Sequence, residues 1–415
     1  MKILWVKAGG LVPPDTGGKI RSYNILRELA RRHSITFFSF YAAHDGDLHP
    51  KLKDVFEQVV YMPLQLPAPK SVAEMRNYGI RLLSAEPYSI TKYCLPEVRR
   101  RLRALLEQES YEVILCDFIF AAGVIPWDWP GPKVLFTHNV EAAIWRRHYE
   151  VASNPIWKAI SWREWKKMEA AERRYLHLAD HVLTVSDTDR DTFAGFLDPG
   201  KLTVIPTGVD IDYFQPMPVE ETLNSLVFTG SMDWLPNEDA ILYFLEAILP
   251  LIKQECPGVS LEVVGRRPSP KLQALAEREK SVRLTGWVED IRPFVARASI
   301  CIVPLRIGGG TRLKIFEAMA MSKAVVSTPV GAEGLPVQAG DNILLAEAPR
   351  DFADSVISIL RDPEERKRMG ASARVLVQEN YSWPKVAENF VRTLHEAVIS
   401  FKPSFKTRHV QATER

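Results

Sequence analysis

The sequence has few cysteines and no long apolar run. Its four cysteines are far apart and form no C-x-x-C pair: Cys94, Cys116, Cys256 and Cys301. This spacing supports neither a zinc site nor a disulfide framework, and it favours reduced thiols inside a core. No stretch of about eighteen apolar residues occurs, so a transmembrane helix is not expected. The first residues, MKILWVKAGG, lack a signal-peptide cleavage pattern, and we therefore expect a cytoplasmic protein.

An excess of charge of one sign is also absent. Lys and Arg number 53 against 51 Asp and Glu, which leaves a net charge of only +2. Because a nucleic-acid coat protein needs a strong positive field, we expect no nucleic-acid partner, and any basic function must be local. The chain has 415 residues, 46% of them hydrophobic, which is enough for the buried cores of two domains.

Two phosphate-binding fingerprints are missing. The segment GGGTRLK (308–314) lacks the spacing of a P-loop, and neither it nor PPDTGGKI (13–20) matches the dinucleotide fingerprint of dehydrogenases. Nucleotide hydrolysis and hydride transfer are therefore disfavoured.

Short apolar runs alternate with helical patterns along the chain, which is typical of βαβ units and parallel sheets. We expect strands at 2–6, 34–40, 111–118, 132–138 and 181–186, and a second series at 225–230, 259–265, 282–288, 298–305 and 323–329. A Pro-rich stretch at 202–222 is interpreted as an interdomain linker. The sequence thus predicts an α/β protein of two doubly wound halves joined near residue 210.

The most informative stretch is RIGGGTRLKIFEAMA, residues 306–320, which follows a predicted strand and opens a helix. Gly308–Gly310 allow backbone N–H groups to converge on an anion at the positive end of that helix. Arg312 and Lys314 add a guanidinium and an ammonium, a common pair for a pyrophosphate. Glu317 can accept hydrogen bonds from sugar or ribose hydroxyls. A flexible turn before a solvated helix face is the alternative, but the order of these features favours a phosphate site.

The chain resembles the retaining glycosyltransferases of family 4, the group 1 glycosyl transferases with the GT-B fold. The resemblance covers nearly the whole chain and rests on the order and spacing of several segments. They are PPDTGGKIRS (13–22), FTHNVEAAIWRR (136–147), ADHVLTVSDTDRDTF (179–193), VIPTGVDIDYF (204–214), VFTGSMDWLPNEDA (227–240) and the run from RLTGWV to GAEGL (283–335).

The resemblance implies two Rossmann-like domains that face each other across a cleft. An acceptor-side domain would cover 1–208 and a nucleotide-sugar-binding domain 209–382, with a helix at 383–402 crossing back to the first domain and a polar tail at 403–415. The activity implied is transfer of a sugar from a nucleotide-diphosphate sugar to a glycan or lipid-linked glycan acceptor, with retention of configuration. Neither a cofactor nor a metal is implied, and cell-surface or exopolysaccharide synthesis is the expected setting.

The family pattern also implies roles for individual residues. Four would act at the reacting centre: His138 beside the transferred sugar, Arg312 and Lys314 on the diphosphate, and Glu317 on the ribose. The implied donor-binding positions are Gly17, Gly18, Gly230, Ser231, Gly286, Trp287, Val288, Gly309, Gly310, Thr311 and Leu313. Asp117 and Asn139 are candidates on the acceptor side. A lone histidine at a strand end is otherwise more often structural.

This sequence departs from the family in two places. Gly309 stands where relatives carry the first of two glutamates, which commonly touches the donor sugar. The segment Ser231–Asn237 lacks the Arg and Lys that many relatives use for the diphosphate. We hypothesise that Arg312 and Lys314 supply the missing cations, with sugar contacts from backbone amides or Glu333. The donor sugar, its base, the acceptor and the linkage are not predicted.

Two further segments mix cations with aromatic and aliphatic residues at helical spacing: EVRRRLRALL (97–106) and IWKAISWREWKKMEAAERRYL (156–176). A helix lying on an anionic membrane has this pattern, and so does an ordinary helix with one solvated face. Peripheral contact with the inner face of the cell membrane is therefore one of two interpretations. For the function, a sugar-nucleotide epimerase of the same fold and a non-catalytic nucleotide-sugar-binding protein are the alternatives.

Overall fold

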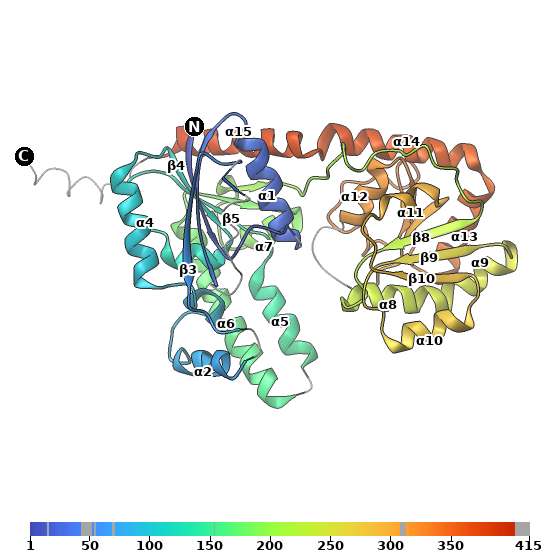
Figure 1. The fold of residues 1–415 in the computed structure, drawn as a ribbon, viewed down its shortest axis with the longest axis horizontal. Helices are drawn as coiled ribbons and strands as arrows, with labels where there is room; N and C mark the ends of the chain where they lie inside the picture. The colour runs from blue at the N-terminus through green and yellow to red at the C-terminus, as the bar shows by residue number, and fades with distance from the viewer. Residues whose placement is uncertain are drawn as a thin grey trace, which may run out of the picture. The chain divides into compact units, whose positions relative to one another are not determined.

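The computed structural model describes residues 1–14, 16–42, 52–53, 55–68, 71–152, 154–307 and 313–402. The chain divides into two compact units (Figure 1). Unit 1 comprises Met1–Pro206 and the chain from Val386 onward, and unit 2 comprises Thr207–Lys385. Each unit contains one parallel sheet with helices packed against it, so the predicted α/β fold with two Rossmann-like halves is confirmed.

Unit 1 is built on seven parallel strands in the order β3-β2-β1-β4-β5-β6-β7. The strands are β1 (Lys2–Ala8), β2 (Ser34–Ala42), β3 (Gln58–Leu64), β4 (Val113–Asp117), β5 (Lys133–Phe136), β6 (His181–Thr184) and β7 (Leu202–Val204). The helices are α1 (Gly17–Leu29), α2 (Val72–Ile80), α3 (Tyr88–Thr91), α4 (Pro96–Gln108), α5 (Glu141–Val151), α6 (Pro155–Leu178), α7 (Asp187–Ala194) and the long C-terminal α15 (Trp383–Ser400).

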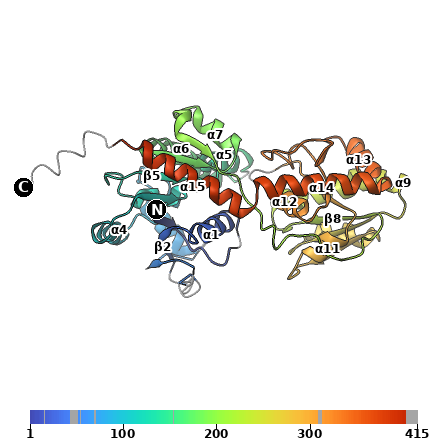
Figure 2. The same cartoon turned by 90° about the horizontal axis from the view of Figure 1, so that it is seen from above.

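The central strands of unit 1 read as continuous apolar runs because helices cover both faces of the sheet. In β1 the four residues from Ile3 to Val6 are fully buried. The last helix joins this core: the ring of Phe390 in α15 stacks on Trp5 at 5.6 Å and meets Phe136 edge-on at 5.3 Å. Figure 2 shows α15 lying along unit 1.

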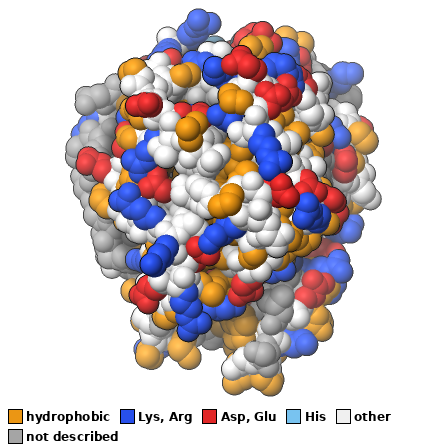
Figure 3. Space-filling view, turned by 90° about the vertical axis from the view of Figure 1, so that its right-hand side faces the viewer, with side chains coloured by type: hydrophobic (Ala, Val, Ile, Leu, Met, Phe, Trp, Pro, Cys, Tyr) orange, Lys and Arg blue, Asp and Glu red, His pale blue; other side chains and the backbone are white. Residues whose placement is uncertain are grey.

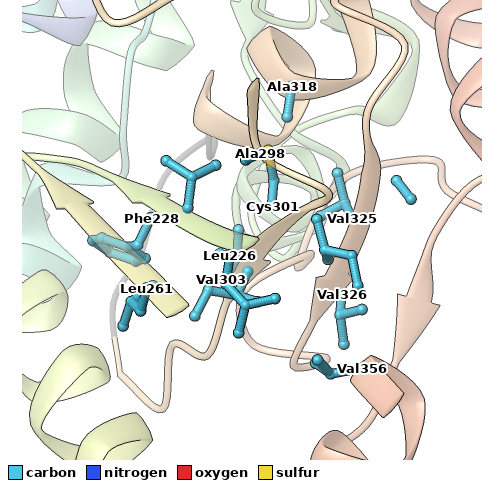
Figure 4. Packing of buried hydrophobic residues seen from close by; sticks show 14 of the residues in the cluster. Leu226, Phe228, Leu261, Ala298, Cys301, Val303, Ala318, Val325, Val326 and Val356 are labelled. Carbon is cyan, nitrogen blue, oxygen red and sulfur yellow. The ribbon is translucent and has the colours of Figure 1, made fainter. Parts of the chain in front are cut away.

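Unit 2 is built on six parallel strands in the order β10-β9-β8-β11-β12-β13. The strands are β8 (Ser225–Thr229), β9 (Ser260–Val264), β10 (Val282–Gly286), β11 (Ile300–Val303), β12 (Ala324–Ser327) and β13 (Leu344–Leu345). The helices are α8 (Leu235–Tyr243), α9 (Leu249–Glu255), α10 (Pro270–Arg278), α11 (Arg292–Arg297), α12 (Leu313–Ala320), α13 (Pro349–Arg361) and α14 (Pro363–Asn380). Figure 4 shows part of its core, where side chains of β8, β11 and β12 pack together.

The strand predictions missed β3, β7 and β13. Of these, β7 lies at the start of the predicted linker, so the linker prediction is wrong over Leu202–Val204. Two of these residues, Thr203 and Val204, are β-branched, and the strand pairs with Val182–Thr184 of β6. This short edge strand was not predicted because a proline-rich segment follows it directly, and prolines argue against a strand.

Candidate functional site

In unit 1, polar side chains gather at the carboxyl ends of the central strands. Lys7 lies near the end of β1, Asp117 ends β4, and His138 follows β5 by two residues. Lys7 and Asp117 are register partners in the parallel pair β1 and β4. Since the carboxyl ends of parallel strands meet at one edge, this is where ligands of open α/β sheets bind.

These side chains form one buried hydrogen-bonded chain. Asp117 Oδ2 accepts hydrogen bonds from Trp5 Nε1 at 2.9 Å and from Lys7 Nζ at 3.0 Å. Asp117 Oδ1 lies 2.6 Å from His138 Nε2, and Arg21 Nη1 lies 2.8 Å from His138 Nδ1. Because a guanidinium can only donate, Nδ1 must be the acceptor, and the remaining proton lies on Nε2 and is donated to Asp117. The geometry therefore assigns a neutral imidazole to His138.

The pKa shifts agree with this assignment. Burial lowers the pKa of His138 to about 4, against the opposing effect of Asp117. Burial alone would raise the pKa of Asp117, but Lys7 and His138 hold it well below its usual range. Burial also lowers the pKa of Arg21, to about 10. At neutral pH this hydrogen-bonded chain of side chains thus contains a carboxylate, a neutral histidine and two cations.

The predicted residues of unit 1 occupy different positions around this chain. Asp117 and His138 are in direct contact, and both are buried. A Cβ atom on Gly18 would lie 3.8 Å from His138 Nδ1, so the first turn of α1 packs against the imidazole. Gly17 is exposed in the same turn, and the Asn139 amide donates to Glu141 Oε1 at 3.2 Å. Their roles toward a substrate stay predictions.

Sequence reasoning missed three members of the chain: Trp5, Lys7 and Arg21. Lys7 carried a signal, because it is a charged residue at the end of an otherwise apolar strand run, and it is buried in the fold. Arg21 lies in the predicted helix that follows the N-terminal glycines, one turn after Gly18. Nothing in the linear pattern pairs it with a histidine more than a hundred residues away.

In unit 2, three strand ends meet at glycines. Gly230 follows β8 and donates to Val264 O at 2.9 Å, and Gly265 follows β9 and donates to Gly286 O at 3.1 Å. A Cβ atom on Gly265 would lie 1.8 Å from Gly230 O, so no side chain fits there. Gly230 has φ +152°, and a Cβ atom on it would come within 2.8 Å of Lys314 Nζ. The close approach of backbone and ammonium at this point requires glycine.

Lys314 lies in the first turn of α12, and its ammonium reaches the loop between β8 and α8. Nζ donates to Asn237 Oδ1 at 2.7 Å and lies 3.9 Å from the centre of the Phe228 ring. The Asn237 amide in turn donates to Ser231 O at 2.9 Å. The cation of Lys314 therefore lies beside Ser231–Asn237, the segment that itself has no Lys or Arg.

A second cation that sequence reasoning missed contacts the same loop. Arg266, just after β9, donates from Nε to Ser231 Oγ at 3.0 Å. Its neighbour Arg267 donates to Asp233 Oδ2 at 3.1 Å, and Ser231 Oγ donates to Asp233 Oδ1 at 2.5 Å. The available signal was the pair Arg266 and Arg267 directly after the predicted strand 259–265, at the sheet edge where ligands bind.

Glu317 follows Lys314 by about one helical turn and is half-buried. Burial raises the pKa of its carboxyl group to about 7, with Lys314 opposing the shift. Among the described residues, no hydrogen bond is donated to this carboxylate. Such a group is placed to accept hydrogen bonds from a ligand that carries hydroxyls.

The other predicted residues of unit 2 are in varied surroundings. Trp287 is 71% exposed after β10, whereas Val288 packs against the core. Leu313 begins α12. Four predicted positions lie outside the described residues: Gly309, Gly310, Thr311 and Arg312.

Two features are absent from the described residues. No group of three or more His, Cys, Asp or Glu side chains is arranged there to hold a metal ion. No helix in the same parts of the chain is both long and apolar enough to cross a bilayer.

Comparison with known proteins identifies the family. A model described as Glycosyltransferase Family 4 matches residues 16–213, and one described as Glycosyl transferases group 1 matches residues 224–362. The chain belongs to the family 4 glycosyltransferases. The two models meet near the division between unit 1 and unit 2, so each unit of this glycosyltransferase has its own match.

Relatives of this glycosyltransferase are distant in sequence. An uncharacterized 44.6 kDa protein in the cps region of Klebsiella pneumoniae is 21% identical over 69% of this chain and 75% of its own length. The MMP alpha-(1->4)-mannosyltransferase of Mycolicibacterium hassiacum is 28% identical over 61% of this chain and 62% of its own length. The crystal structure of Anabaena HepE with UDP-glucose has a TM-score of 0.62 at 16% identity, covering 95% of this chain and 100% of HepE. The structural likeness supports the GT-B fold.

Proposed function

We propose that this glycosyltransferase moves a sugar from a nucleotide-diphosphate sugar to a glycan or lipid-linked glycan acceptor. We further propose that the transfer retains the anomeric configuration and needs no resident metal or cofactor. Cell-surface or exopolysaccharide synthesis at the cytoplasmic side of the membrane is the proposed setting. We propose no nucleic-acid partner.

The observation that carries the proposal is the position of Lys314 beside Ser231–Asn237, with Glu317 one turn further along α12. During transfer the leaving nucleoside diphosphate gains negative charge, which a fixed ammonium stabilises without further reorganisation. Lys314 is held by Asn237 at 2.7 Å and therefore needs little ordering when a donor binds. Arg266 offers a second cation within contact of Ser231.

The carboxylate of Glu317 fits the ribose of the same donor. It is half-buried, accepts no hydrogen bond from a described residue, and has a pKa raised by burial to about 7. Two ribose hydroxyls would supply donors to this group and so offset its desolvation. The exposed Trp287 is available to pack against the base.

Names of relatives support the donor and setting without identifying either. HepE was crystallised with UDP-glucose, which supports a UDP-sugar as the first donor to try. The Klebsiella relative belongs to a cps region, and another relative is a mannosyltransferase, so a GDP-mannose donor should be tried beside it.

The deciding experiment incubates the purified chain with a panel of nucleotide sugars, with and without glycan acceptors, and measures release of nucleoside diphosphate. Acceptor-dependent release, with a product of retained configuration by NMR, is expected. Conversion of a nucleotide sugar without any acceptor would instead indicate an epimerase. Donor binding in calorimetry without release for any acceptor would indicate a binding protein. Activity that survives chelation is the expected result for metal independence.

A further inference from the structure

Unit 1 carries an exposed apolar surface on helix α2 and the turn that follows it. Helix α2 has no buried residue, although it is short and well capped by Ser71. Five large apolar side chains on this segment are exposed: Val72, Met75, Ile80, Leu82 and Leu83. Leu83 is 99% and Val72 83% exposed. An isolated exposed leucine needs no explanation, but five within twelve residues mark an interaction surface.

The first turns of α6 continue this surface. Ile156, Trp157 and Trp162 are exposed there, with Trp162 at 51%. Figure 1 places α2 and α6 at the lower end of unit 1, and Figure 3 shows orange apolar side chains protruding at the lower end of the face that it draws. We call the eight exposed apolar residues of these two elements the α2–α6 surface.

Hydrogen bonds join α2 and the turn after it to α6, so the surface belongs to the ordered structure of unit 1. Tyr78 of α2 donates to Glu164 of α6 at 3.1 Å. Arg163 Nη2 donates to Arg81 O at 3.2 Å, and Lys167 Nζ donates to Leu82 O at 3.2 Å. Hydrogen bonds to the backbone of the turn hold Leu82 and Leu83 outward rather than allowing them to fold into a core.

The positive charge of the α2–α6 surface indicates which kind of partner it binds. Residues 71–84 and 154–168 contain six Lys and Arg against two Glu, and one of the two, Glu164, is buried in the contacts just described. Exposed Lys158 and Lys166 stand among the tryptophans of α6. Tryptophan and lysine beside protruding aliphatic side chains are suited to the headgroup region of an anionic bilayer. A symmetric contact with a second copy would place these cations against one another.

We propose that the α2–α6 surface binds the surface of an anionic phospholipid bilayer. The apolar side chains enter the headgroup and acyl boundary, and the flanking cations contact the lipid phosphates. Helix α4, the other cation-rich segment, does not take part, because its apolar residues Val98, Leu102 and Leu105 are buried in the unit 1 core. This binding goes beyond the proposed transfer reaction and does not depend on it.

The test is flotation with vesicles of phosphatidylcholine, with or without phosphatidylglycerol. We expect binding to the anionic vesicles that weakens at high salt. The double variant Leu83→Ser with Trp162→Ser should lower the partition coefficient about tenfold or more. Lys158→Gln with Lys166→Gln should lower it about tenfold. Leu223→Ser, a 77% exposed leucine of unit 2, is the matched control and should bind like the unchanged protein.

Several outcomes would overturn the proposal. They are no binding to either vesicle, binding that the double variants leave unchanged, and a dimer in light scattering that Leu83→Ser with Trp162→Ser dissociates. Donor binding measured without vesicles tests the proposed function separately, so the failure of one proposal is distinguishable from the failure of the other.

Discussion

Both sheets place cations at the carboxyl ends of their strands, but the two units treat those cations differently. In unit 1, Lys7 and Arg21 are buried and point at Asp117 and His138, and Lys7 also donates to Ser22 Oγ at 3.3 Å. In unit 2, Lys314 contacts the neutral Asn237, Arg266 contacts Ser231 and lies 4.0 Å from the Asp233 carboxylate, and the nearby Glu317 carboxylate accepts no hydrogen bond from a described residue.

The difference indicates two kinds of polar site. The unit 1 chain is satisfied internally, so it stabilises the sheet edge and holds one arrangement of α1 and the strand ends. The unit 2 cluster lies closer to solvent, and the Glu317 carboxylate is placed to accept hydrogen bonds from an external partner. A direct role for His138 as a proton acceptor would require breaking its hydrogen bond with Arg21, because Nδ1 is its only unprotonated nitrogen.

The largest effect we predict comes from breaking the unit 1 chain. Asp117→Asn leaves Lys7 buried without its carboxylate, so the free energy of unfolding should fall by about 3–5 kcal/mol. Chemical denaturation followed by tryptophan fluorescence would measure it, since Trp5 donates to Asp117. Asp128→Asn removes the partner of Arg103 in an exposed ion pair and should cost under about 1 kcal/mol. Equal losses for the two variants would contradict the comparison.

Sequence patterns predicted the two parallel sheets because apolar runs and turn residues are local signals. They also predicted Lys314 and Glu317, since a glycine loop, two cations and a carboxylate lie within ten residues. The partners of these groups come from elsewhere: Asn237 reaches Lys314 across 77 positions, and Asp117 reaches Lys7 across 110. Such pairings follow from strand order, β1 beside β4 and β8 beside β11, which a linear pattern does not specify.

The matching test in unit 2 should affect catalysis rather than folding. Lys314→Ala removes the ammonium that we propose stabilises the leaving diphosphate, so kcat/KM should fall about 10²–10³-fold. Because Lys314 lies at the sheet edge, the free energy of unfolding should change far less than in Asp117→Asn. Lys253→Ala on α9, which breaks an ion pair with Glu279 at the end of α10, is the control. Unchanged kcat/KM in Lys314→Ala would refute the assignment of this cation to the donor.

A fall in pH should lower the free energy of unfolding of unit 1, because His138 is buried as a neutral imidazole. The folded-state pKa of about 4 lies below the ordinary value of 6.5, so the unfolded chain takes up the proton first as pH falls. The stability that the neutral histidine contributes is therefore present above pH 6.5 and is lost toward pH 4, by about 3 kcal/mol at most. His138→Gln should flatten this part of the pH profile, whereas the exposed His177→Gln should follow the unchanged protein. Parallel profiles for all three would contradict a buried neutral imidazole.

The smallest predicted effect concerns the carboxylate of unit 2. Since burial raises the pKa of Glu317 to about 7, the fraction of the acceptor-only carboxylate form grows as pH rises through that value. The nucleotide sugar that the panel identifies as the donor, whose diphosphate ester does not titrate near neutrality, should therefore bind more tightly at about pH 8 than at about pH 6. Glu317→Gln should bind it about tenfold more weakly at the higher pH and lose the pH dependence, because its amide accepts at only one atom. Calorimetry at both pH values measures this, with the exposed Glu364→Gln as control. If Glu317→Gln kept the pH dependence of the unchanged protein, the titrating group would be another residue. The ribose would then be bound without the Glu317 carboxylate, and unit 2 would lose the acceptor that distinguishes its site from the internally hydrogen-bonded side chains of unit 1.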